Sequence, residues 1–187
     1  MQSDFKYSFL NRKLVCSNSL FDVYFDHLEL PSHSVEDFLT VKPKVSQGDE
    51  KVIGVCVLPK INDSFALMKG WRHQFNDIVW QAPTGFVDSG EKYENTALRE
   101  LREETSLICD PLNLISLGYY IPDAGLIEGR IALYLANNCQ YVNDDIREEI
   151  GMGKLHLFTP KKLNKLICST KNMGGSTIIT CMRSLNK

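Results

Sequence analysis

Hydrophobic positions alternate imperfectly with polar ones between residues 6 and 30, and Pro31 ends this pattern. Alternation at every second residue is typical of strands with one covered face, so the segment predicts two or three antiparallel strands. Residues 32–50 are rich in Ser, Pro, Lys and Asp, with a short strand indicated at 38–41 and a polar turn at 46–50. We therefore predict that a first, β-rich unit ends in this turn.

The change of pattern divides the chain into residues 1–47 and residues 48–187. The second part opens on a continuous apolar run at 52–58, which has the length of a strand with both faces covered. An apolar segment at 65–68 follows a turn and is a plausible hairpin partner. Both segments predict strands of a central sheet.

Helical signals alternate with further strands in the second part. Residues 91–105 lack Gly and Pro and favour helix, whereas 114–120 and 131–136 have strand composition. At 159–167 a capping Thr precedes Pro at the first helical position, and residues 178–185 carry apolar side chains at helical spacing after a Gly-Gly-Ser break. The order predicts an α/β fold.

Composition and charge narrow the class of protein. The chain has 187 residues, of which 43% are hydrophobic and 24% are charged, as in ordinary folded domains. Its formal charge is 21 − 23 = −2, so it lacks the basic field that supplies affinity for polynucleotides. We expect one domain with a small appendage, and no nucleic-acid partner.

The cysteines and apolar runs indicate a cytoplasmic setting. None of the six cysteines belongs to a C-x-x-C pair of the kind used for zinc or redox chemistry, so they are interpreted as buried or incidental thiols. The N-terminus lacks the apolar stretch of a secretory signal, and no apolar run reaches the 18 residues of a membrane span. We therefore expect a reducing, cytoplasmic environment and no membrane partner.

The helix predicted at 91–105 carries an acidic arc. At 3.6 residues per turn, Glu100, Glu103 and Glu104 fall beside an apolar arc that contains Ala97 and Leu101. Like charges at this spacing repel one another, but a divalent cation would make their proximity favourable. Oxygen ligands at this density suit Mg²⁺ or Mn²⁺, which keep waters and substrate phosphates in their other positions. The arc thus indicates metal-assisted diphosphate chemistry.

The spacing alone leaves a second interpretation open. Helices rich in Glu and Arg are common on protein surfaces, where they form solvated faces of mixed charge. Arg99 lies one turn from Glu103 and can orient that carboxylate by a charge-assisted hydrogen bond in either case. Helical spacing by itself favours the plain surface helix.

The wider stretch resembles the Nudix box, G-x5-E-x7-R-E-U-x-E-E-x-G-U, in which U is aliphatic. The departure from the pattern is Ser106, where the family has the glycine that ends the helix; serine at positive φ costs about 1 kcal/mol there. The positions that match are Gly85, Glu91, Arg99, Glu100, Leu101, Glu103, Glu104 and Leu107.

This resemblance implies a fold and a metal site. The fold is the Nudix α/β/α sandwich with a mixed sheet, here preceded by a small N-terminal antiparallel β-domain. Glu100 and Glu104 are implied as metal ligands, and Glu103 as a ligand or a catalytic partner of the ligands. The backbone carbonyl of Thr84, just before the box, is implied as a further ligand for Mg²⁺ or Mn²⁺.

The resemblance also implies residues that act beside the metal. Arg99 and Glu91 are expected to hold the loop and the helix in register. A glutamate on a loop well beyond the box is expected as general base, and the acidic run at 143–150 lies at a suitable distance. We favour Glu149, then Glu148; the alternative is that this run is only a solvated turn.

The segment before the box resembles the Q-Y-R and W-E-x-P-A-G motifs of ADP-ribose pyrophosphatases and related nucleotide-sugar hydrolases. Trp80 and Pro83 agree with it, and Arg72 matches an arginine suited to clamp a diphosphate. Gln81 replaces the family's Glu and Thr84 its Ala. Arg72 and Trp80 are therefore predicted to contact substrate, with a surface role as the alternative for Arg72.

Two further substrate residues are predicted beyond the box. These hydrolases carry a proline 15 or 16 residues after it, and Pro122 lies 15 positions after Leu107. The usual S-P-G is replaced by the sequence at 121–125, which changes the polarity of the loop. Glu128 is predicted to correspond to the acidic residue that follows that motif.

The N-terminal unit resembles the extra β-domain of this subfamily, which commonly dimerises. We therefore expect a homodimer. Phe21, Tyr24 and Phe25 are available to stack on a base in the partner's nucleotide pocket, although core packing is the more common role of such residues.

The resemblance implies metal-dependent hydrolysis of the pyrophosphate of ADP-ribose or a nucleotide sugar, giving a nucleoside monophosphate and a sugar phosphate. One alternative is a Nudix diphosphatase for coenzyme A, dinucleoside polyphosphates or nucleoside triphosphates. The W-x-x-P-x-G segment and the N-terminal β-domain argue against it, because small triphosphatases usually lack that extension. Another is a catalytically silent module that binds a nucleotide. The intact Glu100, Glu103 and Glu104 argue against a silent module, because silent relatives typically lose these carboxylates.

Overall fold

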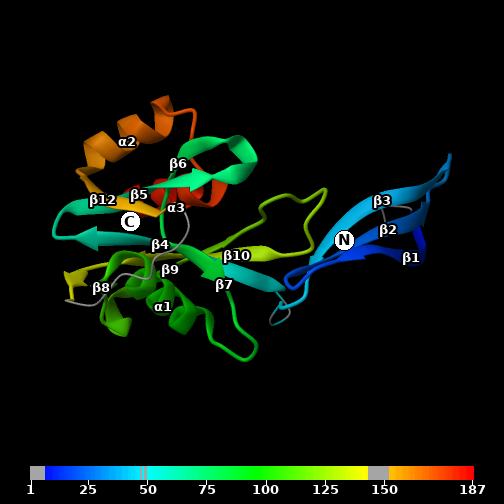
Figure 1. Ribbon diagram of the computed structural model, residues 1–187, viewed down its shortest axis with the longest axis horizontal. Coiled ribbons are helices and arrows are strands. Elements are labelled where there is room, and N and C mark those ends of the chain that lie inside the picture. Colours follow the sequence, from blue (N-terminus) through cyan, green and yellow to red (C-terminus); the bar gives the residue numbers. More distant parts are fainter. Residues whose placement is uncertain (1–6, 47, 49, 143–151) are drawn as a thin grey trace.

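A three-stranded antiparallel sheet extends from one end of an α/β body (Figure 1). The computed structural model describes residues 7–46, 48, 50–142 and 152–187. The strands of the N-terminal sheet are β1 (Ser8–Ser17), β2 (Phe21–Glu29) and β3 (Ser34–Pro43). The N-terminal antiparallel sheet predicted from the alternation is thereby confirmed.

The N-terminal strands differ from the prediction in detail. Residues 8–29 form two strands, within the two or three predicted, whereas the short strand expected at 38–41 is part of the longer β3. Alternation is imperfect because the β1–β2 ladder shifts register between Phe9 and Asn11 and between Leu14 and Cys16. Half of the residues of β3 are exposed, and the polar residues among them interrupt the alternation that would indicate a strand.

The body is built on a seven-stranded mixed sheet among the described residues. Its central order is β12-β5-β4-β10-β9, with β6 paired to β5 and β7 paired to β4. The β4–β10 pair is parallel and the other pairs are antiparallel. The strands are β4 (Val52–Ile61), β5 (Ser64–Arg72), β6 (Asp77–Gln81), β7 (Thr84–Phe86), β9 (Leu114–Tyr120), β10 (Arg130–Ala136) and β12 (Met152–Phe158). A separate pair joins β8 (Leu107–Ile108) to β11 (Gln140–Tyr141).

Helices cover both faces of this sheet (Figure 1). Val55 and Val57 of β4 belong to the hydrophobic core formed with α1, whereas Cys56 and Leu58 belong to the core formed with α2 and α3. Successive strand residues point to opposite faces, so the continuous apolar run at 52–58 reflects a strand buried on both sides. The helices are α1 (Tyr93–Thr105), α2 (Pro160–Ser169) and α3 (Gly175–Leu185), with short 3₁₀ turns at His73–Phe75 and Pro111–Asn113.

All six cysteines are free thiols. Four are buried, and Cys16 and Cys168 are exposed. Burial raises the pKa of Cys56 to about 11, which keeps this thiol protonated at neutral pH. Among the described helices, none is both long and apolar enough to cross a membrane.

Ser106 ends α1 in the left-handed conformation, with φ 54° and ψ 27°. Its backbone N–H donates to the carbonyl of Arg102 at 2.9 Å, which closes the last turn of the helix. Ser106, where the sequence departs from the glycine of the Nudix pattern, therefore lies at the end of the helix, as expected.

We expect Ser106→Gly to stabilise the protein by up to about 1 kcal/mol, because glycine adopts positive φ without steric cost. Glycine also increases the conformational entropy of the unfolded chain, and this offsets part of the gain. Thermal unfolding measures the change, with catalytic activity unaltered. A clear fall in Tm would show that the serine side chain is worth more than the strain it causes.

Candidate active site

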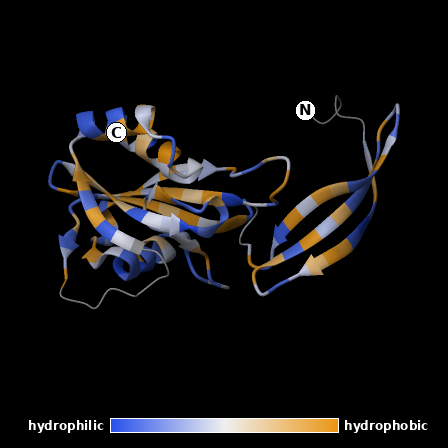
Figure 2. Cartoon of the chain, turned by 45° about the horizontal axis from the view of Figure 1, so that its top comes forward, coloured by the Kyte–Doolittle hydropathy of each residue, from blue (hydrophilic) through white to orange (hydrophobic). Residues whose placement is uncertain are grey.

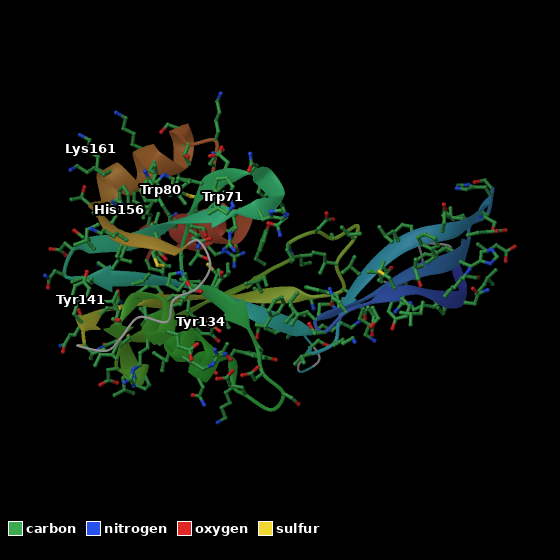
Figure 3. The ribbon with its side chains drawn as sticks, viewed as in Figure 1. Trp71, Trp80, Tyr134, Tyr141, His156 and Lys161 are labelled. Carbon is green, nitrogen blue, oxygen red and sulfur yellow. The ribbon has the colours of Figure 1, made fainter. Side chains whose placement is uncertain are left out.

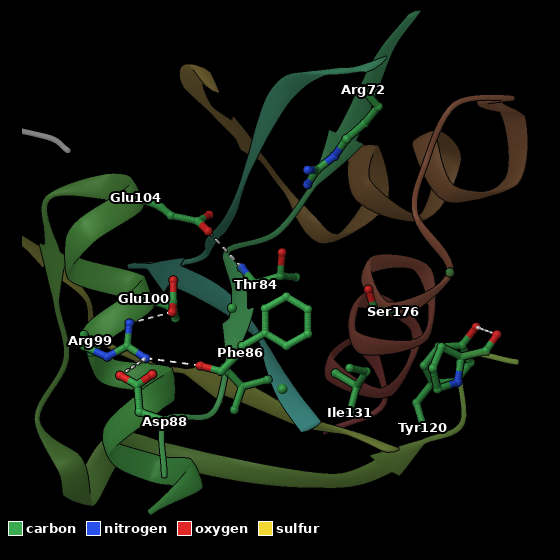
Figure 4. A pocket seen from close by; sticks show the side chains of 15 residues that line it. Arg72, Thr84, Phe86, Asp88, Arg99, Glu100, Glu104, Tyr120, Ile131 and Ser176 are labelled. Carbon is green, nitrogen blue, oxygen red and sulfur yellow. Dashed lines mark hydrogen bonds and ion pairs between the residues drawn. The ribbon is translucent and has the colours of Figure 1, made fainter. Parts of the chain in front are cut away.

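A pocket of about 860 Å³ opens where the box meets the middle of the sheet (Figure 4). Its size suits a nucleotide-sized ligand. Strands β4 and β7, helix α1, the segment after β9 and the first turn of α3 all contribute to its walls. The lining residues with functional groups or rings are Arg72, Thr84, Phe86, Asp88, Arg99, Glu100, Glu104, Tyr120, Pro122 and Ser176.

Helix α1 presents two buried carboxylates to this pocket. Glu100 and Glu104 are each only 6% exposed, and both line it. The Oε1 atom of Glu104 accepts a hydrogen bond from the backbone N–H of Thr84 at 3.3 Å. Glu103 lies on the same helix but is not among the lining residues. Two carboxylates buried side by side require neutralisation by cations, which is the arrangement that a divalent metal exploits.

Arg99 ties the helix to the loop that precedes it (Figure 4). Its Nη1 donates to Glu100 at 2.6 Å and to Glu103 at 3.3 Å. Its Nε and Nη2 each donate to Glu91 at 3.1 Å, and Nη2 also reaches the carbonyl of Phe86 at 3.3 Å. The structure thus brings Arg99 and Glu91 together across the loop, as the resemblance implies.

This network keeps Glu91 ionised. The hydrogen bonds from Arg99 are the largest cause of its lowered pKa, and the Thr96 hydroxyl adds to them. The pKa of Glu91 is lower in the folded chain than in the unfolded chain. The Glu91–Arg99 pair therefore stabilises the fold at pH values above the unfolded pKa, and this stabilisation is lost as the pH falls through the folded pKa.

The close approach of β7 to α1 requires glycine at position 85. A Cβ built there would overlap the carboxylate of Glu100, which Arg99 holds from its other side. Gly85 pairs with Val55 in the sheet, so its backbone has little freedom to retreat. The first position of the box therefore leaves room for a metal ligand.

The donor set at this end of the pocket fits a hard divalent cation. It combines the carboxylates of Glu100 and Glu104 with the adjacent main chain at Thr84. Within the described ranges, no three His, Cys, Asp or Glu side chains converge on one point. Mg²⁺ needs only one or two carboxylates, because waters and substrate phosphates complete its octahedron. Glu103 accepts a hydrogen bond from the same Arg99 nitrogen that holds Glu100.

Arg72 and the polar Ser176 line the same pocket from other elements. Arg72, from the end of β5, donates to the side chain of the buried Gln81. Gly70 leaves room for that glutamine, since a Cβ on it would overlap the Gln81 amide. Ser176, in the first turn of α3, faces the same space (Figure 4). Arg72 and Pro122, both predicted as substrate-binding residues, thus lie in one pocket with the acidic helix.

Two predicted substrate residues lie outside this pocket. Trp80 packs edge-on against His156 and Phe158, with ring centroids 5.2 and 5.3 Å away, on the side of the sheet covered by α2 (Figure 3). Glu128 forms ion pairs near the N-terminal sheet instead of lining the pocket. The candidate bases Glu148 and Glu149 lie outside the described residues.

Several pocket residues were missed from the sequence. Phe86 is 43% exposed and lies edge-on to Phe21, with centroids 5.7 Å apart. Tyr120 and Ser176 also line the pocket. The sequence around Tyr120 indicates only a strand, and the sequence around Ser176 indicates only a break before a helix. Phe21, one of the three aromatic residues proposed for stacking, is therefore in contact with a pocket residue through its ring.

Comparison with known proteins is consistent with this site. Residues 50–162 match the NUDIX domain family. The chain is 27% identical over 133 residues to an ADP-ribose pyrophosphatase of Bacillus subtilis (strain 168), a match covering 71% of this chain and 67% of that protein. It is also 47% identical over 55 residues to an RNA pyrophosphohydrolase of Pelagibacter ubique (strain HTCC1062), covering 29% of this chain and 33% of that protein.

A solved structure supports the fold over the whole chain. A crystal structure of an ADP compounds hydrolase superposes with a TM-score of 0.79, covering 100% of this chain and 96% of that one at 16% identity. The α/β/α sandwich with its N-terminal sheet is thereby confirmed. The chain therefore belongs to the NUDIX domain family, and within it the chain resembles ADP-ribose pyrophosphatase.

Proposed function

We propose that this Nudix enzyme uses Mg²⁺ or Mn²⁺ to hydrolyse the pyrophosphate of ADP-ribose or a nucleotide sugar, giving a nucleoside monophosphate and a sugar phosphate. The observation that carries the proposal is that Glu100, Glu104 and Arg72 line one and the same pocket. A diphosphate needs cations on both sides when it leaves water, and this pocket offers a metal site and a guanidinium. The likeness to ADP-ribose pyrophosphatase supports the choice of substrate.

Each residue has a defined task in this proposal. Glu100 and Glu104, with the Thr84 carbonyl, hold the metal, which supplies charge neutralisation and a lowered pKa for the attacking water. Arg99 fixes the Glu100 and Glu103 carboxylates by hydrogen bonds.

Binding groups and the base complete the site. Arg72, oriented by Gln81, binds the phosphates, and Phe86 offers a ring at the pocket wall. We keep Glu149, then Glu148, as the proposed general base that takes the proton from water.

Product analysis tests the reaction directly. The purified protein is incubated with ADP-ribose, ADP-glucose, UDP- and GDP-sugars, NADH, coenzyme A, diadenosine polyphosphates, dGTP and 5′-triphosphorylated RNA, with Mg²⁺ or with EDTA. We expect AMP and ribose 5-phosphate from ADP-ribose, and no products in EDTA. Preferred turnover of the RNA would favour the activity named for the Pelagibacter relative, whereas nucleotide binding without any turnover would favour a silent module.

We also propose that residues 1–47 form a domain through which two chains associate. Every residue of β1 is exposed in the single chain, and the hydropathy colouring shows apolar residues along all three strands (Figure 2). Exposed apolar sheet faces of this extent mark interaction surfaces. Leu10 and Leu14 of β1 are 48% and 53% exposed.

Sedimentation of the whole chain tests this association. We expect a dimer, and a monomer when Leu10 and Leu14 are both replaced by Lys. A wild-type chain that sediments as a monomer at micromolar concentration would rule it out.

We further propose that the protein is located in the cytoplasm. Two of the six free thiols, Cys16 and Cys168, are exposed, and such thiols persist in reducing compartments.

A further inference from the structure

The segment between β9 and β10, residues 121–129, connects the active-site pocket to the N-terminal sheet. At its two ends Tyr120, Pro122 and Ile131 line the active-site pocket. Its middle lines a second cavity of about 450 Å³, shared with residues of β1 and β3. Figure 1 shows this segment reaching from the body toward the N-terminal sheet. We call it the bridging loop.

The bridging loop pairs with the outer edge of β3. The backbone N–H of Val41 donates to the carbonyl of Leu126 at 2.8 Å, and the N–H of Glu128 donates to the carbonyl of Val41 at 3.0 Å. Val41 and Ile127 form a parallel bridge. In the order β1-β2-β3, the loop thus occupies the edge that β3 would otherwise expose.

Ion pairs secure the same part of the loop. The Oε1 atom of Glu128 lies 2.6 Å from Nζ of Lys51, and Oε2 lies 3.3 Å from Nη1 of Arg12 in β1. Arg12 is itself oriented by Asp26, whose oxygens accept its hydrogen bonds at 2.6 and 2.8 Å. The Tyr24 ring lies 4.9 Å from the guanidinium. Arg12 is thus preorganised to meet the loop.

The charges in this second cavity are balanced. Asp26 is 5% exposed and also accepts the Thr40 hydroxyl at 2.8 Å. Lys51 is the largest cause of the lowered pKa of Glu128, so that carboxylate is ionised at neutral pH. Arg12, Lys51 and the Glu128 carboxylate line the cavity, and the buried Asp26 pairs with Arg12. The two cations are thus matched by two carboxylates, which leaves no excess charge for an additional anion.

We propose that the N-terminal sheet positions the substrate-binding wall of the pocket through the bridging loop, and that Glu128 is a positioning residue. Glu128 links Arg12 and Lys51, while Val41 holds the loop backbone, and together they fix where Pro122 and Tyr120 meet the pocket. This inference rests on the proposed function for its kinetic consequence. Its structural content, the attachment of the loop to β3, can be tested without any substrate.

The first test replaces Glu128 with Lys in the whole chain. Amide hydrogen exchange should accelerate in peptides covering 121–130, because Lys at 128 faces Arg12 and Lys51 as a like charge. Glu36→Lys, the same charge change at an exposed position of β3, is the matched control. Equal exchange in the wild type and Glu128→Lys would overturn the proposal.

A second pair of variants isolates the backbone contact. Val41→Pro removes the donor to Leu126 while sparing the β2–β3 ladder, because the bond to Leu126 shows that this N–H points away from β2. Pro43, two residues further on, already occupies an equivalent position in β3. Leu39→Pro is the control for the general effect of proline, because Leu39 lies two residues before Val41 in β3 and its N–H therefore points to the same side of the strand. Faster exchange in the bridging loop should appear with Val41→Pro only.

Kinetics then separate positioning from chemistry. With whichever substrate the wild type hydrolyses, KM should rise about three- to tenfold in Glu128→Lys and Val41→Pro, with kcat within about twofold. Lys51→Met should have a smaller effect, and the double variant Lys51→Met/Glu128→Gln should be non-additive. Faster exchange with an unchanged KM would show that the N-terminal sheet holds the bridging loop but does not position the substrate-binding wall, and would overturn that part of the proposal. Absence of turnover on ADP-ribose would contradict only the proposed function, since the exchange result stands apart from it.

Discussion

Glu104→Gln is expected to lower kcat by at least about 10²-fold while leaving the fold intact. The glutamine has the same shape and can still accept the hydrogen bond from the Thr84 N–H through its carbonyl oxygen. It cannot supply the negative charge that a divalent cation requires of its ligand. The loss should therefore appear in turnover and in metal affinity, with little change in stability.

Three measurements define this result. Steady-state kinetics across a Mg²⁺ titration give kcat and the half-saturating metal concentration, and thermal unfolding reports the fold. Glu94→Gln, the same replacement at an exposed position in the first turn of α1, is the matched control and should retain wild-type kcat. Near-wild-type activity of Glu104→Gln at low Mg²⁺ would remove Glu104 from the metal site.

Gly85→Ala is expected to reduce kcat by about 10²-fold through a single added methyl group. The new Cβ would occupy the space of the Glu100 carboxylate, which must then swing away from both the pocket and Arg99. A displacement of about 1 Å at a catalytic group is enough for a loss of this size. Because the carboxylate is the flexible end of its side chain, the cost should fall on activity more than on folding.

The metal requirement distinguishes this explanation from simple misfolding. Gly85→Ala should need a higher Mg²⁺ concentration for half-maximal activity, and its circular dichroism spectrum should match that of the wild type. Gly174→Ala is the control, because a Cβ there would meet nothing closer than 3.9 Å. An active Gly85→Ala enzyme with an unchanged Mg²⁺ requirement would mean that Glu100 does not hold the metal.

Local patterns predicted the acidic helix well because its information is contained within a few turns. Helical spacing places Glu100, Glu103 and Glu104 on one arc, and the structure retains that arc in α1. The serine at the helix end adopts the positive φ expected of the family's glycine. The apolar run of β4 likewise predicted a strand covered on both faces.

Local sequence patterns could not predict contacts between segments that are distant along the chain. Glu128 was predicted from a motif as a substrate residue, and its partners in the structure, Lys51 and Arg12, could not be read from that motif. Arg12 lies 116 positions away. Trp80 fits a motif beside the box, yet its ring packs on His156. A motif records which residues are present near one another in sequence, whereas partners are chosen by how separate strands align.

The sequence by itself determined the box, the carboxylate pair on one helix and the α/β order of elements, because period and residue type decide these within a single segment. Only the tertiary structure decided that Arg72, Pro122 and Ser176 share one pocket with Glu100, and that the bridging loop attaches to β3. These juxtapositions depend on sheet pairing and on packing between segments about 20 to 90 residues apart, for which no local periodicity exists.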